Sequence, residues 1–192
     1  SERYKKAMLQ KMFPQKGEKV PRVRFAGFSG DWKLSVLNKL AARFDNLRIP
    51  VTASDRIEGE TPYYGANGIQ GYVEGFTHEG EFVLLAEDGA NDLTNYPVQH
   101  VFGKIWVNNH AHVLGAKKNI MSNSYLANVL KTINMIPYLV GSGRAKLNSS
   151  AMMEIKIKYP TLEEQTLIGN LFQKLDQNIK FEKKKLEQYQ MM

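Results

Sequence analysis

The chain has 192 residues, 43% of them hydrophobic, which suits one core-forming domain with appended helices and argues against disorder. It contains no run of roughly 18 apolar residues that could span a membrane, and its first residues are too highly charged for a secretory signal. We therefore expect a cytoplasmic protein with no membrane partner. The absence of cysteine excludes disulfides and thiolate metal sites.

The net charge of +7 is concentrated at the N-terminus, where the first 24 residues carry eight Lys and Arg against two Glu. The rest of the chain is nearly neutral, but several of its basic residues fall in pairs. These pairs are Arg43 and Arg48, Lys117 and Lys118, Arg144 and Lys146, and Lys156 and Lys158. If the fold brings them to one face, they form a surface for nucleic-acid phosphates. A solvated surface of mixed charge is an equally good interpretation of charge alone.

The first predicted element is a helix that Pro14 ends, since proline cannot continue a helix. Its apolar face consists of Tyr4, Met8, Leu9, Met12 and Phe13. Because the helical pattern already includes the start of the chain, we expect a piece excised from a longer protein.

Residues 20–160 predict a compact mixed domain of the α+β class. Helical spacing runs from Leu34 to Phe44, and a second helix begins at Ser122 or Asn123 and is closed by Pro137. Short strands rich in β-branched and aromatic residues are predicted at 69–73, 82–86, 98–102, 104–107, 111–114 and 155–159. Their irregular order, with few regular crossovers, argues against a doubly wound sheet.

The most informative segment is the long amphipathic helix predicted over residues 161–192. Thr161 can serve as its N-cap, with Glu164 three residues later completing a capping box. Apolar residues then recur with a helical period, and this stripe needs a partner. The stripe includes Ile168, Leu171, Leu175 and Ile179. The N-terminal helix is a candidate partner, and the alternative is that both helices fold onto one globular body.

Two glycine-rich loops could carry binding residues. In the first, glycine recurs at every third position around Tyr64 and Asn67, and Asn67-Gly68 predicts a tight turn between strands rather than a phosphate cradle. The second offers a guanidinium, an ammonium and an amide from Arg144, Lys146 and Asn148. Arg can bind guanine and Asn can bind adenine through two hydrogen bonds, so this loop suits a DNA groove. A surface linker is an equally good interpretation of its composition.

Signals for catalysis are weak. His110 and His112 should share one side of a strand, but the sequence indicates no third metal ligand for them. Glu87 and Asp88 would point to opposite faces of a strand, which does not suit joint acid and base work. Residues 154–156, Glu-Ile-Lys, match the last element of a metal-dependent nuclease signature, without a Pro-Asp at a convincing distance before it.

Several motifs together resemble the specificity subunit of type I restriction-modification enzymes. They are PRVRF at 21–25 with Trp32 downstream, YYGANG at 63–68, EDGA at 87–90, VNNHAHV at 107–113, and PTLEEQ at 160–165 followed by Leu175 and Asp176. The resemblance covers nearly the whole chain, and the order of the motifs makes it specific.

The resemblance implies a reader of DNA rather than a catalyst. Residues 1–14 would be the end of a conserved spacer helix, 20–160 a target-recognition domain, and 161–192 the next spacer helix, with the helices forming an antiparallel coiled coil. Such a domain reads one part of a bipartite site on double-stranded DNA. The helices dock methyltransferase subunits, which bring S-adenosylmethionine and flip an adenine. A separate restriction and translocase subunit moves and cuts DNA.

The chain departs from this family in length, since the family subunit has two recognition domains in tandem. Either two copies pair head to tail through the helical stripe, or the chain is half of a longer subunit. No methylation motif of the Asn-Pro-Pro-Phe kind and no nucleotide-binding loop occurs in the sequence, so we expect neither a catalytic residue, nor a metal, nor a cofactor in this chain.

Our hypothesis for recognition separates phosphate contacts from base contacts. Phosphates are assigned to Lys117, Lys118, Lys156 and Lys158. Base edges are assigned to Tyr64, Asn67, Arg144, Lys146 and Asn148. A stand-alone metal-dependent nuclease and a coiled-coil adaptor are the alternative functions.

Overall fold

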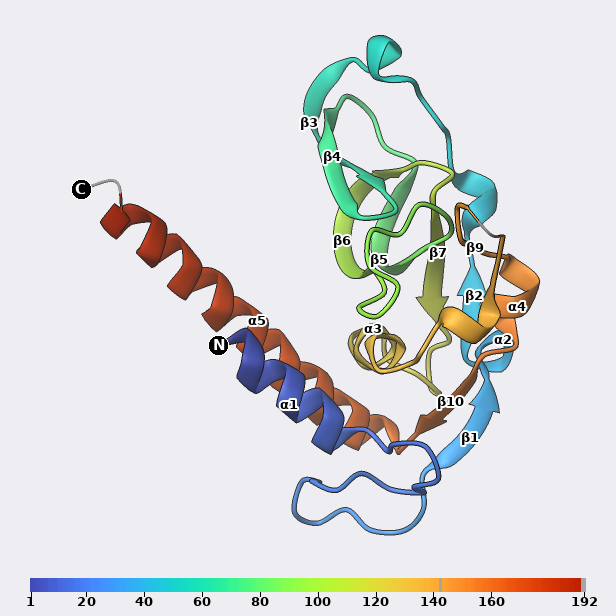
Figure 1. Ribbon diagram of the computed structural model, residues 1–192, viewed down its shortest axis with the longest axis vertical. Coiled ribbons are helices and arrows are strands. Elements are labelled where there is room, and N and C mark those ends of the chain that lie inside the picture. The colour runs from blue at the N-terminus through green and yellow to red at the C-terminus, as the bar shows by residue number, and fades with distance from the viewer. Residues whose placement is uncertain (142, 191–192) are drawn as a thin grey trace.

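The computed structural model describes residues 1–141 and 143–190. It consists of a mixed α/β body and two helices, α1 (Glu2–Met12) and α5 (Leu162–Gln190), that lie along one side of the body (Figure 1). Both helices lie within the predicted ranges, and the mixed fold class is confirmed; the last two residues of the predicted helix 161–192 lie outside the described residues.

A six-stranded sheet forms most of the body, with the strand order β2-β7-β5-β6-β3-β4. In that order the strands are Ala41–Arg43, Ala111–Ala116, His78–Ala86, Val98–Val107, Glu58–Gly65 and Gly68–Val73. Neighbours are antiparallel except β3 and β6, which run parallel and pair Tyr63 with Trp106. The sheet is therefore not of the doubly wound parallel type, as expected.

Smaller elements join the sheet to the helices. They are β1 (Lys33–Val36), α2 (Leu37–Leu40), η1 (Asp45–Leu47), η2 (Ala53–Asp55), α3 (Asn123–Lys131), η3 (Ile136–Tyr138), β8 (Leu139–Val140), β9 (Lys146–Leu147), α4 (Ser149–Met153) and β10 (Lys156–Tyr159). The start of α3 is as predicted, because the Ser122 side chain accepts a hydrogen bond from the Tyr125 N–H at 3.2 Å.

The prediction of a helix from Leu34 to Phe44 is wrong. Only α2, a single turn, is helical, and β1 and β2 flank it. Tertiary pairing overrides the local pattern here, since β1 forms an antiparallel ribbon with β10 and β2 is an edge strand of the main sheet. The prediction also split β6 into two strands at Gly103 and missed β3.

One hydrophobic core links the body to the first half of α5. Phe13, just after α1, lies between α3 and α5, with ring centroids 5.4 Å from Tyr125 and 5.9 Å from Phe172. All three side chains are buried, and Ile168 belongs to the same cluster. The predicted interpretation of α1 and α5 as helices folded onto a globular body therefore holds for their shared end.

The start of α5 is anchored by an ion pair that the sequence pattern did not indicate. Thr161 accepts a 3.5 Å hydrogen bond from the Glu164 N–H, which is half of the predicted capping box. The other half is replaced, since the Glu164 carboxylate, with no exposed surface, accepts two bonds of 2.7 and 2.8 Å from Arg24. A buried carboxylate is costly unless its charge is paired, and the Arg24 guanidinium provides that charge whereas a capping contact to a backbone N–H does not.

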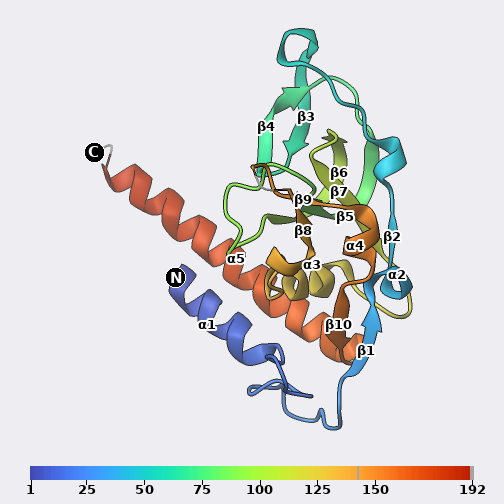
Figure 2. The ribbon, with the colours of Figure 1, turned by 45° about the vertical axis from the view of Figure 1, so that its right-hand side comes forward.

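The two long helices run antiparallel, side by side (Figures 1 and 2). Lys183 donates to Glu2 at 2.8 Å and Lys5 pairs with Asp176, which brings the start of α1 beside the middle of α5. Of the predicted pairing residues, Ile168 is buried, Leu171 and Leu175 pack against the core, and Ile179 is half-buried. A coiled coil along the whole of α5 stays a prediction.

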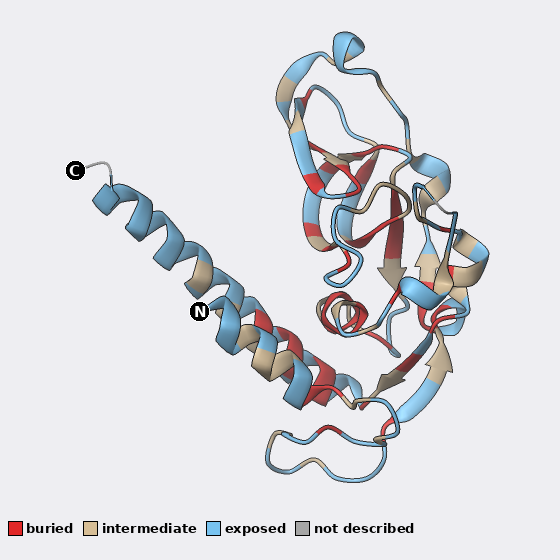
Figure 3. Ribbon diagram, viewed as in Figure 1, coloured by how far each residue is buried: buried red, intermediate tan, exposed pale blue. Residues whose placement is uncertain are grey.

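The last turns of α5 extend past the start of α1 and are exposed (Figure 3). Phe181, Leu186 and Tyr189 each show more than half of their surface to solvent. Among the described residues, none of the helices combines the length and the apolar character needed to cross a membrane.

Candidate nucleic-acid interface

Three segments distant in sequence meet at one end of the sheet. They are the β3–β4 turn, the loop that follows β5, and the segment from β8 to β9. Asn67 in the turn donates through Nδ2 to the Gly89 carbonyl at 2.9 Å and accepts from the Asn91 N–H at 2.9 Å. The predicted tight turn is confirmed, and its amide is used to hold the neighbouring loop.

Arg144 lies over this loop. Its Nη2 atom is 3.1 Å from Asp88 Oδ1 and 3.3 Å from His110 Nδ1, while 61% of the side chain stays exposed. Gly89 has a φ of +70°, and a Cβ atom there would stand 2.9 Å from Arg144 Nη2. The positive φ angle therefore favours glycine at position 89, whereas the flexible Arg144 side chain could move away from a Cβ atom there.

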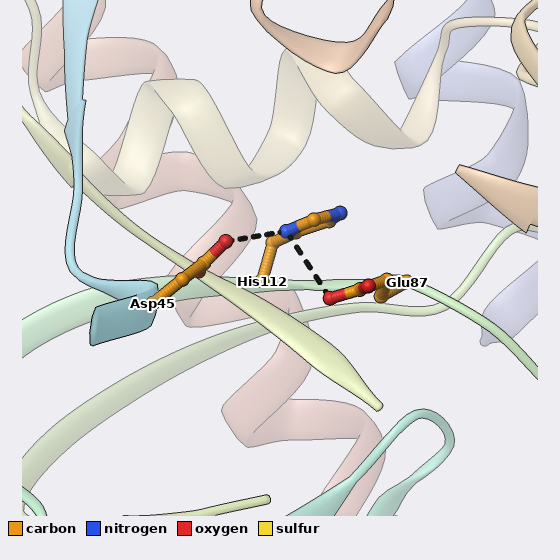
Figure 4. A group of neighbouring side chains, drawn as sticks. All are labelled: Asp45, Glu87 and His112. Atoms are coloured by element: carbon orange, nitrogen blue, oxygen red, sulfur yellow. Dashed lines mark hydrogen bonds and ion pairs between the residues drawn. The ribbon is translucent and has the colours of Figure 1, made fainter. Parts of the chain in front are cut away.

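Below this surface lies a buried ionic network, with His112 between Asp45 and Glu87 (Figure 4). His112 Nδ1 is 2.7 Å from Asp45 Oδ2 and 3.7 Å from Glu87 Oε2. Arg48 donates to Glu87 at 2.7 Å, and Lys146 lies 3.0 Å from the other oxygen of that carboxylate. The network ties η1, the end of β5, β7 and β9 together.

Both ring nitrogens of His112 lie beside oxygen atoms. Its Nε2 atom faces the Leu147 carbonyl oxygen at 2.8 Å, and its Nδ1 atom faces the Asp45 carboxylate. Burial alone would raise the pKa of Asp45, but hydrogen bonds from His112 and the Val113 N–H outweigh burial and lower that pKa.

The pKa of Glu87 is set by the same two opposing effects. Burial disfavours its charged form, but hydrogen bonds from Arg48 and Lys146 outweigh burial, and the pKa of Glu87 is lower than usual. The oxygen and nitrogen atoms of Asp45, Glu87 and His112 lie within 4.8 Å of one another, a spacing that a metal could use. In the described part of the chain, however, both carboxylates already pair with Arg or Lys side chains, and each His112 nitrogen already faces an oxygen atom of the protein. We interpret the group as an ion-pair network.

The structure brings some predicted site residues together and separates others. Asn67, Arg144 and Lys146 meet around the loop after β5. Tyr64 is next to them in β3, where its carbonyl accepts from the Asn108 N–H at 3.1 Å and burial raises the pKa of its hydroxyl. Asn148 is exposed directly before α4.

The predicted phosphate-binding lysines do not join this group. Lys117 and Lys118 follow β7 and are exposed, and the Lys117 ammonium donates to the Asn38 carbonyl at 2.7 Å. Lys156 and Lys158 lie on β10, at the lower end of the body and away from β9 (Figures 1 and 2). The Lys158 ammonium donates to the Glu18 carbonyl. Of the predicted DNA-binding residues, Asn67, Arg144 and Lys146 therefore come together around one loop, and their role in base readout stays a prediction.

Sequence reasoning missed the residues that hold this surface. Asp88 and His110 position Arg144, and Asp45 and Arg48 complete the buried network. The adjacent Glu87 and Asp88 do serve different partners, as their alternation in a strand suggested. His110 and His112 also contact different carboxylates, Asp88 and Asp45, which agrees with the prediction that the two histidines do not form a metal site.

Residues 30–190 match the family model described as the type I restriction modification DNA specificity domain. The chain belongs to this family. A Haemophilus influenzae protein named as a type I restriction enzyme specificity subunit is 46% identical over 149 residues, which are 78% of this chain and 38% of that protein. The EcoprrI specificity subunit of Escherichia coli is 30% identical over 115 residues, 60% of this chain and 28% of that subunit.

Solved structures of specificity subunits share the fold. The S subunit from M. genitalium matches with a TM-score of 0.66 and 20% identity, over 81% of this chain and 42% of that one. The HsdS subunit from Thermoanaerobacter tengcongensis matches with a TM-score of 0.58 and 15% identity, over 93% and 44%. This member of the specificity-domain family thus spans less than half the length of the relatives that it matches.

Proposed function

We propose that this specificity domain reads one part of a bipartite DNA site for a type I restriction-modification complex and catalyses no reaction itself. The observation that carries the proposal is the surface around Arg144, where three segments present an exposed guanidinium on a rigid base. Family membership supports the DNA-reading role, and the ionic network supports the rigidity that base readout requires.

In this proposal, the surface around Arg144 reads base edges. A guanidinium can donate two hydrogen bonds to the acceptors of guanine in the major groove. Asp88 holds Arg144 in the free protein through one contact, so most of the guanidinium remains available. Lys146 lies two residues from Arg144 and pairs with Glu87 of the network below, and we assign Tyr64 and Asn148 to the same readout. Lys117, Lys118, Lys156 and Lys158 contact phosphates more remotely and carry no sequence preference.

The helices supply the assembly surfaces. The proposal includes methyltransferase subunits that bind S-adenosylmethionine, a restriction and translocase subunit, and a second recognition unit, all in the cytoplasm. The exposed end of α5 would extend an antiparallel coiled coil into that second unit and so set the distance between the two half-sites. This chain needs no cofactor of its own for any of these roles.

The experiment is a DNA-selection assay with the chain co-expressed with the methyltransferase subunit encoded in its own genome. We expect a stoichiometric complex that selects a defined sequence. Arg144→Ala should relax the preference at one or two base pairs, at a cost of about 1–3 kcal/mol each on the cognate site. Lys117→Ala should weaken all DNA roughly equally and reduce the salt slope by about one unit.

Two results would contradict the proposal. A folded chain that cuts DNA with magnesium and without partners would indicate a nuclease. A complex that assembles but has no DNA affinity would indicate an adaptor. An equal loss on cognate and random DNA for Arg144→Ala would remove Arg144 from base readout while leaving the DNA-reading role in place.

A further inference from the structure

A polar cleft of about 800 Å³ separates α1 from the loop that joins β5 to β6. Its walls and floor come from four segments: α1, the β3–β4 turn, that loop with the start of β6, and the end of α3. Among the lining residues are Lys5, Lys6, Asn67, Asn91, Gln99 and Lys131. Because Asn67 lines it, the cleft is continuous with the surface around Arg144.

Lys131, the last residue of α3, has no hydrogen-bond or ion-pair partner for its ammonium among the described residues. The charged groups that face it are Glu2 and Lys5 of α1 and Asp176 of α5. These three are engaged elsewhere, since Lys5 pairs with Asp176 and Glu2 pairs with Lys183. Lys131 is therefore a half-buried cation without a counter-ion.

The other charges of the cleft do not compensate Lys131. Asp92 accepts hydrogen bonds from the Thr94 and Asn95 backbone and from the Thr94 hydroxyl, within its own loop. Lys6 is exposed on α1, and its charge acts on Asp92 of the same cleft, so these two largely offset one another and leave Lys131 as the uncompensated cation. The Gln99 amide also lines the cleft and adds donor groups. An acceptor-only anion of low charge fits this set of donors and cations.

We propose that Lys131, at the floor of this cleft, binds a phosphate group of the DNA backbone. The choice of DNA as the source of the phosphate rests on the proposed function. A strand whose bases lie at the Arg144 surface can continue past Asn67 into the cleft, so base readout and a phosphate contact follow one another along the same strand. This contact fixes the register of the DNA on the domain.

The inference has a pH-dependent consequence. Burial and the nearby Lys5 lower the pKa of Lys131 to about 8, and a bound phosphate would stabilise its charged form and raise that pKa again. Binding therefore takes up protons near pH 8. Affinity for the phosphate is greatest when Lys131 is charged and falls as the pH rises above the free-state pKa.

The first test follows the Lys131 side chain by NMR, through its Cε and Nζ signals, in the full chain. The probes are a four-nucleotide oligothymidylate and inorganic phosphate. We expect the oligonucleotide to shift the Lys131 signals and to raise the pKa of Lys131. Unchanged signals with both probes would overturn the site. A response to inorganic phosphate alone would overturn DNA as the ligand.

The second test measures duplex binding by the complex with its methyltransferase partner at several salt concentrations. Lys131→Met should lower the salt slope by about 0.9, because one phosphate contact is lost, and Lys131→Arg should retain the slope. Lys184→Met, which removes an equal charge from the exposed end of α5, is the matched control. An unchanged slope for Lys131→Met in a complex that binds DNA would overturn this inference alone, whereas no DNA binding by the wild-type complex would overturn the proposed function with it.

Discussion

At the scale of single residues, two buried histidines of the main sheet have opposite surroundings. His112 faces acceptors on both sides and pairs with two carboxylates. His78, also buried, donates from Nε2 to the Phe44 carbonyl and accepts at Nδ1 from the Thr77 hydroxyl, and burial lowers the pKa of His78. One histidine is thus part of an ionic network and the other is a neutral core residue.

The ionic network predicts a loss of stability in acid. The pKa of Glu87 is lowered on folding, so its contribution is present above the ordinary glutamate pKa and is lost as the pH falls through the folded value. We expect the wild-type free energy of unfolding to decrease below about pH 5. Glu87→Gln should cost about 2 kcal/mol at pH 7 and make the decrease shallower.

Urea unfolding at a series of pH values measures this difference. Glu74→Gln, at an exposed position on the loop after β4, is the control and should match the wild type at every pH. A Glu87→Gln variant as stable as the wild type at pH 7 would show that the network adds nothing to folding.

Sequence reasoning identified the exposed members of the site but not their partners. Arg144 stood out because it lies in a glycine-rich segment with an amide nearby. Asp88 is 56 residues away in sequence, and only the fold places its carboxylate 3.1 Å from the guanidinium. A side chain's partner depends on which loops share one end of the sheet, and local pattern carries no information on that.

At the scale of elements, α5 approaches α3 unusually closely at Gly169. A Cβ atom at this position would stand 2.1 Å from the Ser124 Oγ atom and 2.8 Å from the Ser124 Cβ atom. The missing side chain lets the two helices pack at a distance that keeps Phe172 in the core. The predicted stripe on α5 included apolar residues only, and it therefore overlooked the glycine that permits the contact.

The close approach predicts a reciprocal pair of substitutions. Gly169→Ala should lower the free energy of unfolding by about 2 kcal/mol, because α3 must shift to admit the methyl group. Adding Ser124→Gly removes the obstructing side chain and should restore part of the loss, with a coupling energy of about 1 kcal/mol.

A double-mutant cycle in urea measures this coupling. Asn170→Ala, at the next and exposed position of α5, is the control for the helix itself and should change stability little. Additive effects of Gly169→Ala and Ser124→Gly would contradict a direct steric contact between the two positions.

At the scale of the whole molecule, the apolar stripe of α5 continues past the end of its partner helix. Ion pairing places Glu2, at the start of α1, beside Lys183. Leu186 and Tyr189 continue the spacing of Leu175 and Ile179 beyond that point and are exposed. Among the described residues nothing covers this part of the stripe, and its coiled-coil period suits pairing with another helical segment.

A charge in this part of the stripe should separate folding from assembly. Leu186→Lys should leave the free energy of unfolding of the free chain within about 0.5 kcal/mol, because the side chain is already exposed. It should weaken association with a second recognition unit at least tenfold, since a lysine would be buried in the helix pair.

Light scattering and co-purification with a differently tagged copy measure this effect. Gln188→Lys adds the same charge to another side of α5 and should leave assembly intact. Equal assembly by the Leu186→Lys variant and the wild type would exclude this part of α5 from the interface.

The sequence alone was enough to predict the helices at both ends, five of the ten strands in the described residues and the resemblance to a specificity subunit, because periodicity, capping residues and short motifs are local properties. The family match confirms that resemblance. Only the tertiary structure decided that residues 34–44 are mostly strand, that Glu164 pairs with Arg24, and that Lys131 lies in a cleft beside Asn67. These features depend on contacts between segments that are far apart in the chain. The strand pairing and the pairing of buried charges that stabilise them form only when the chain folds.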